Sequence, residues 1–151
     1  MPTISHVQDK LAIRELIENW AVWRDSFMWD KFRTVWHKEG RMWATWFQGT
    51  YEEFIAANLA GYAKGVRIYH FLGGTSIDIK GKRAIAQTKM SISQRAKVDG
   101  VECDVICIGR FYDFLEKRKG QWAWCGAASP TRRIRSFRSI RRQRPSWTRS
   151  C

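Results

Sequence analysis

The stretch that decides the fold is Arg67-Ile68-Tyr69-His70-Phe71-Leu72-Gly73-Gly74, which has the composition of the first strand of a sheet. From residue 65 onward the chain is strand-like, in segments near residues 66–79, 84–98, 101–116 and from 121. Three short sequences separate them: Lys80-Gly81-Lys82, Asp99-Gly100 and Lys119-Gly120. Glycine accepts the positive φ that tight hairpin turns need. The sequence therefore predicts a long-stranded antiparallel meander, with a bulge or bend at Gly73-Gly74.

Helices are predicted before this sheet. Apolar residues at i, i+3, i+4 and i+7 predict an amphipathic helix over roughly residues 5–24, with Ser5 as its cap. A short helix follows over about 29–37, and a strand over 41–47. Thr50 and Glu53 form a capping-box pattern that opens a third helix, to about residue 64. A sheet of this kind must curl to bury its inner face. The expected fold is α+β: a curved antiparallel sheet, or half-barrel, covered by N-terminal helices and enclosing a hydrophobic pocket.

The chain of 151 residues is expected to form one domain over residues 1–123, followed by a basic tail over 124–151. The formal net charge is +13, but eight arginines and no acidic residue in 124–151 leave only +5 for the remainder. This distribution disfavours a nucleic-acid-binding body, and non-specific binding through the tail is the one such contact we expect. We also expect the chain beyond Pro130 to leave the sheet.

The tail has neither strand nor helix periodicity, and its composition is what GC-rich DNA gives when read out of frame. A frameshift is therefore one hypothesis for its origin, and a native disordered basic arm that binds anions is the other. The coding DNA distinguishes them: an alternative register with an early stop would exclude the frameshift.

Composition also limits the class of protein. Nine tryptophans and eight phenylalanines indicate a core of large rings or a cavity lined by them. No window approaches the roughly 18 apolar residues of a membrane helix, and no signal peptide is recognisable, so we expect a cytoplasmic protein without membrane contact. The cysteines lack paired metal-ligand spacing; Cys103 and Cys107 are expected to pack rather than ligate, and no metal or cofactor is predicted.

Asp25 and His70 are the main candidates for catalytic residues. A carboxylate facing an imidazole fixes the tautomer of the ring and raises its basicity, which is the minimal machinery of a general base. A purely structural histidine remains the alternative for His70, and a helix-terminal turn residue the alternative for Asp25, although an acid there opposes the helix dipole. The expected pocket-lining residues are Trp20, Trp43, Phe47, Met90 and Phe111. Core packing is the simpler interpretation of Trp43 and Phe47, which are expected to share one strand face.

The chain resembles the SnoaL-like branch of the nuclear-transport-factor-like (cystatin-like α+β) superfamily over roughly residues 7–123. The resemblance rests on four segments: Ile13-Arg14-Glu15-Leu16-Ile17, residues 40–49, His70-Phe71-Leu72-Gly73-Gly74-Thr75, and Gly109-Arg110-Phe111-Tyr112-Asp113-Phe114. Members usually continue with an Arg-Gln-Pro segment followed by acidic residues. The out-of-frame reading of the tail can restore such a segment.

The resemblance implies an activity. Relatives such as scytalone dehydratase and hexachlorocyclohexane dehydrochlorinase use a histidine, assisted by an aspartate, to remove a proton and drive an elimination. Asp25 and His70 match these two residues by position in the fold. Trp20 stands where the dehydratases have a tyrosine, and the segment from Gln87 to Arg95 offers no second histidine. The identity of the substrate therefore does not carry over.

The sequence predicts a cofactor-independent lyase, similar to a dehydratase or dehydrohalogenase, or an isomerase. It would act on a hydrophobic cyclic small molecule through an Asp25–His70 general-base pair, as a homo-oligomer (dimer or trimer). The alternative is a non-catalytic small-molecule binding or interaction domain on the same fold, because fold alone does not fix function.

Overall fold

Four long strands are joined in succession by the glycine turns that the sequence predicts. In the computed structural model, which describes residues 4–98, 100–128 and 133–137, these strands are β3 (Arg67–Lys80), β4 (Arg83–Val98), β5 (Val101–Arg118) and β6 (Gln121–Ala128). Gly81, Gly100 and Gly120 have φ values of +61°, +78° and +84°, in the region that favours glycine. Each pair of successive strands is antiparallel, so the predicted meander is confirmed.

The N-terminal half contains three helices and two further strands: α1 (Ile4–Asp25), α2 (Trp29–Thr34), β1 (Trp36–Trp43), β2 (Gln48–Thr50) and α3 (Tyr51–Ala63). Both halves of the predicted capping box are present at Thr50 and Glu53. The second helix is shorter than the predicted 29–37, and the strand expected over 41–47 begins earlier and ends at Trp43. The reason is tertiary: Trp36 pairs with Trp124 of β6, which places this segment in the sheet.

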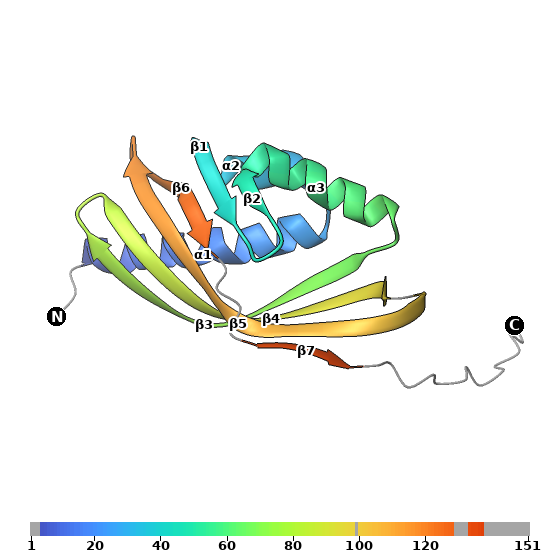
Figure 1. The fold of residues 1–151 in the computed structure, drawn as a ribbon. Helices are drawn as coiled ribbons and strands as arrows, with labels where there is room; N and C mark the ends of the chain where they lie inside the picture. Colours follow the sequence, from blue (N-terminus) through green and yellow to red (C-terminus); the bar gives the residue numbers. More distant parts are fainter. Residues whose placement is uncertain (1–3, 99, 129–132, 138–151) are drawn as a thin grey trace, which may run out of the picture.

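The strand order is β2-β1-β6-β5-β4-β3, with β1 and β6 parallel. Figure 1 shows a strongly bent sheet with the helices on its concave side. The expected α+β fold, a curved and mainly antiparallel sheet covered by N-terminal helices, is confirmed. Among the described residues, no helix is both long and apolar enough to cross a membrane.

The strand β6 continues to Ala128, past the expected start of the tail. A further strand, β7 (Arg133–Phe137), pairs antiparallel with Asp104–Ile108 of β5. The prediction that the chain leaves the sheet beyond Pro130 is therefore wrong for residues 133–137. Backbone pairing depends little on side-chain identity, and the N-terminal half of β5 offers unpaired edge groups beyond the end of β6. Residues 129–132 and 138–151 lie outside the described part.

A bulge in β3 positions the site. Leu72 pairs with Met90 and Thr75 pairs with Thr88, so that Gly73 and Gly74 together oppose Lys89 alone. The extra residue bends the strand. The predicted bulge or bend at the two glycines is confirmed, and it leaves His70 near the beginning of a strand that curves around α1.

The core is built from large rings. Trp20, Phe32, Trp36, Phe54 and Trp124 are each at most 6% exposed, and their ring centroids lie 5.6 to 6.5 Å apart in several neighbouring pairs. Tilted and stacked pairs at such distances add to the free energy gained from burying the rings. Tryptophan rings thus contribute to the packing of the core.

One acidic side chain is buried in this core. Asp113 on β5 is 3% exposed, and its Oδ2 has no hydrogen-bond partner among the described residues. Burial raises the pKa of Asp113 to about 7. The nearby indole N–H of Trp124 opposes this rise only partly, since it does not reach hydrogen-bond geometry.

The raised pKa of Asp113 predicts a loss of stability as pH rises. Below the ordinary carboxyl pKa both states are protonated, and no penalty exists. Between about pH 4 and pH 7 only the unfolded state loses its proton, so the free energy of unfolding falls, by on the order of 4 kcal/mol in total. Asp113→Asn should lose less stability between pH 4.5 and pH 8 in urea unfolding. Asp78→Asn, at an exposed aspartate, is the control. Equal pH dependence of Asp113→Asn and wild type would contradict the buried-acid account.

Candidate active site

The end of α1 presents two charged residues to the interior. The amide of Met28 bonds to the carbonyl of Trp23 at 2.8 Å, and that of Phe27 to the carbonyl of Arg24 at 3.4 Å. This is the Schellman arrangement that ends a helix, with Phe27 at the position normally taken by glycine and a φ of +59°. The tight ending orders the backbone around Arg24 and Asp25.

Asp25 and His70 form a close, buried pair. His70 Nδ1 lies 2.8 Å from Asp25 Oδ1, and the backbone N–H of His70 donates to Asp25 Oδ2 at 2.6 Å. The side chains are 12% and 6% exposed. The predicted approach to hydrogen-bond distance is confirmed, whereas the catalytic role of the pair stays a prediction.

The hydrogen bonds define the protonation of the pair. A carboxylate only accepts, so Nδ1 of His70 carries the proton and Nε2 is left as the acceptor. Burial would raise the pKa of Asp25, but the hydrogen bonds and charge of His70, together with Arg24, hold it below its usual value. Burial lowers the pKa of His70, against the opposing effect of Asp25. At neutral pH the pair is therefore a carboxylate and a neutral imidazole.

Two aromatic rings, which also contact each other, pack against the imidazole. The Trp20 ring meets it edge to face, with centroids 5.3 Å apart, and the Phe111 ring lies at 6.0 Å. These contacts restrict rotation of the imidazole, and they surround it with apolar surface that strengthens electrostatic interactions.

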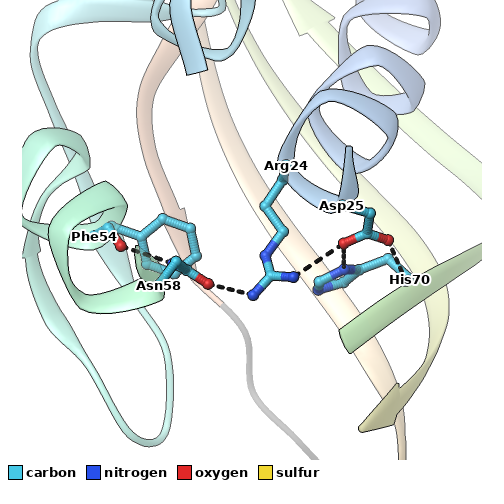
Figure 2. Close-up of polar contacts among 5 residues, drawn as sticks. All are labelled: Arg24, Asp25, Phe54, Asn58 and His70. Atoms are coloured by element: carbon cyan, nitrogen blue, oxygen red, sulfur yellow. Dashed lines mark hydrogen bonds and ion pairs between the residues drawn. The ribbon is translucent and has the colours of Figure 1, made fainter. Parts of the chain in front are cut away.

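Arg24 extends this network toward α3. Its Nη1 donates to Asp25 Oδ1 at 3.1 Å and its Nη2 donates to Oδ1 of Asn58. The Asn58 amide in turn donates to the carbonyl of Phe54 at 2.7 Å. Figure 2 shows the guanidinium between Asn58 and the Asp25–His70 pair. Four side chains and two backbone groups from α1, α3 and β3 are thereby linked in one network of hydrogen bonds.

A two-part cavity opens onto this network. An inner chamber of about 80 Å³ includes His70, Trp20 and Phe111 in its wall. An outer chamber of about 430 Å³ reaches from α3 to β5, with Phe27 and Tyr62 in its wall. The chambers share six wall residues and are therefore adjacent: Arg24, Thr45, Trp46, Ile68, Gln94 and Cys107. The outer chamber lies in the size range of small-molecule sites, while the inner one admits only a small group.

Two of the five predicted wall residues, Trp20 and Phe111, line the cavity, and the other three do not. Trp43 is 40% exposed, because the alternation of β1 turns Met42 inward in its place. Phe47 lies in the turn after β1 and packs on Phe54, with ring centroids 5.5 Å apart. Met90 is 3% exposed and belongs to the core.

The sequence did not identify Arg24, Asn58, Gln94 or Cys107 as wall residues. One signal was available, since Asn58 lies four residues after Phe54 and so on the buried face of α3. Cys103 is buried, and Cys107 faces the cavity. In the part of the chain that the structure describes, no group of three or more His, Cys, Asp or Glu side chains could hold a metal ion.

Comparison with known proteins identifies the family. Residues 5–126 match the SnoaL-like domain family, so the chain belongs to it. Pea pathogenicity protein 2 of Fusarium vanettenii is 40% identical over 117 residues, covering 76% of this chain and 50% of that protein. An uncharacterized protein of Emericella nidulans is 35% identical over 114 residues, covering 74% and 48%. The chain thus spans about half the length of these curated relatives.

Solved structures share the fold at low sequence identity. The hexachlorocyclohexane dehydrochlorinase LinA-type3 of Novosphingobium barchaimii has a TM-score of 0.77 and 11% identity, covering 89% of this chain and 93% of its own. A putative scytalone dehydratase of Novosphingobium aromaticivorans has a TM-score of 0.71 and 17% identity, covering 87% and 89%. At such identities the likeness concerns the fold.

The geometry of the pair predicts how His70 titrates. In wild type, the His70 pKa should lie below the ordinary value of 6.5, with the Nδ1–H tautomer present at neutral pH. Asp25→Asn should lower this pKa further, because it removes the negative charge that favours the imidazolium. Nitrogen-15 NMR of the imidazoles measures both quantities. Asp104→Asn removes a carboxylate that pairs with Arg95 instead, and is the control. An unchanged or higher His70 pKa in Asp25→Asn would refute the pairing.

Proposed function

We propose that this SnoaL-like domain is a cofactor-independent lyase or isomerase that acts on a hydrophobic, cyclic small molecule. His70 is the general base, and Asp25 orients and stabilises it. The single observation that carries the proposal is the 2.8 Å contact between His70 Nδ1 and Asp25 Oδ1, at the inner end of a cavity with aromatic walls. The homo-oligomeric state predicted from the sequence stays a prediction.

The pair suits abstraction of a proton from carbon. His70 Nε2 takes the proton as the C–H bond breaks, and the imidazolium that forms lies against the Asp25 carboxylate. The electron pair of that bond either expels a leaving group from the neighbouring carbon, which is elimination, or is protonated at another carbon, which is isomerisation. No step consumes an oxidant or a reductant.

The form of the cavity supports a hydrophobic substrate. Phe27, Trp46 and Tyr62 are partly exposed around the outer chamber, where they offer apolar ring surface to a cyclic molecule. The outer chamber can hold the body of such a molecule, and only its reacting portion would need to enter the inner chamber. Burial there excludes water and strengthens the contact with the base.

The comparisons give this proposal support by analogy. Two proteins of the same fold carry the names dehydrochlorinase and scytalone dehydratase, both of which denote eliminations. Fold likeness raises the expectation of such chemistry, but the residues must carry it.

A binding domain without catalysis is the second candidate. Trp20 replaces a tyrosine expected of the dehydratases and has no phenolic proton to donate. Its indole N–H also has no hydrogen-bond partner within the described residues. On this account the cavity would hold the same class of molecule without changing it.

Turnover of a panel of cyclic ketones, cyclic alcohols and chlorinated rings separates the two candidates. For any compound converted, His70→Ala should lower kcat/KM by on the order of 10²-fold or more, with circular dichroism at the assay temperature checking that the variant is folded. His37→Gln is the matched control, since the His37 side chain bonds to the carbonyl of Glu116, which does not line either chamber. If His70→Ala converts the compound as fast as wild type, the binding-domain account replaces ours.

A further inference from the structure

Arg24 is a buried cation at the cavity wall. Its side chain is 7% exposed, and a guanidinium remains charged at any pH the protein meets. Removing such a charge from water costs several kcal/mol unless partners compensate for it. The groups that offset the buried charge of Arg24 therefore indicate which kind of ligand the cavity can bind.

The partners of Arg24 within the described residues leave its charge incompletely matched. A guanidinium has five N–H donors. One bond goes to Asp25 Oδ1, at a single point and not in the bidentate form, and one goes to the neutral amide of Asn58. Nε has no partner. The Asp25 carboxylate also accepts both N–H groups of His70, so its negative charge is shared.

The guanidinium is nevertheless held in place. Asn58 is 8% exposed, and its amide nitrogen is anchored on the carbonyl of Phe54, which directs its oxygen to Arg24. Asp25 restrains the other side. Arg24 is thus pre-oriented, so that a ligand would not have to order it on binding.

Arg24 is also the one charged side chain among the described residues that line the two chambers. Asp25 does not line either chamber. A ligand in the cavity therefore meets a cation in apolar surroundings, where a charge-assisted hydrogen bond is strongest.

Arg24 lies close to His70, the proposed base. His70 Nδ1 and Arg24 Nη1 lie 2.8 Å and 3.1 Å from the same oxygen of Asp25. A group bound at Arg24 therefore has its neighbouring atoms close to the imidazole.

We propose that Arg24 is the oxyanion-binding residue of this site, and that the substrate carries a carboxylate or a carbonyl next to the carbon that His70 deprotonates. The inference rests on the proposed function, whose substrate class it names. His70 Nε2 takes the proton, the C–H electron pair moves onto the substrate oxygen, and Arg24 neutralises that oxygen. The pair then returns to expel a leaving group or to take up a proton at carbon.

The test compares two probes of nearly equal shape, 2-naphthoate and its neutral amide, by calorimetry. Wild type should bind the carboxylate at least about 10-fold more tightly. Arg24→Gln should abolish this preference, whereas Arg33→Gln should retain it, because Arg33 pairs with Glu52 on the surface. Asn58→Asp is a second variant that retains Arg24 and supplies it with a carboxylate, and it too should abolish the preference.

Absence of a carboxylate preference in wild type overturns the inference, whether or not the variants fold. A carboxylate preference that persists in both Arg24→Gln and Asn58→Asp also overturns the inference. The proposed function fails separately. A carboxylate preference in wild type, together with turnover that His70→Ala retains, supports the anion site while refuting the lyase.

Discussion

One carboxylate joins the parts of this molecule that make its site. Asp25 accepts hydrogen bonds from the backbone amide of His70, from the imidazole of His70 and from the guanidinium of Arg24. The last residue of α1 is thereby fixed to the fourth residue of β3. The bulge at Gly73-Gly74 bends β3 just beyond this point, so the helix end is joined to the strand next to its bend.

This arrangement buries charged groups at positions that do not favour the stability of the fold. An acid at a helix C-terminus opposes the helix dipole, and a buried arginine and carboxylate both lose hydration. A second buried acid, Asp113, lies elsewhere on the inner face of the sheet. The free energy gained from burying the aromatic rings of the core offsets the cost of burying these charged groups. Proteins accept such costs most often at functional sites.

The sequence predicted the features that local patterns determine. Apolar spacing predicted α1, and glycines at three turns predicted the four long strands. Local pattern failed at Trp36 and His37, which were expected in a helix, because the parallel pairing of Trp36 with Trp124 depends on a segment almost ninety residues away. It failed again at Trp43, since one residue of strand register decides which side chain faces inward.

The candidate site was predictable in part for the same reason. His70 is one of only three histidines in the sequence and Asp25 ends an amphipathic helix, and their meeting followed from the expected fold. Arg24 could not be distinguished from an ordinary basic residue in the last turn of a helix, where a cation is favourable anyway. Only the packing of α3, which brings Asn58 to the guanidinium, reveals that Arg24 is buried.

The central claim is that His70 acts as a base toward carbon acids in the cavity. Incubation with 2-tetralone in D₂O tests this most directly, because deuterium enters the ring only where a C–H bond has been broken. We predict that wild type accelerates exchange at the carbon next to the carbonyl, by on the order of 10²-fold over His70→Ala. Equal exchange rates for wild type and His70→Ala, measured by mass spectrometry, would contradict the account.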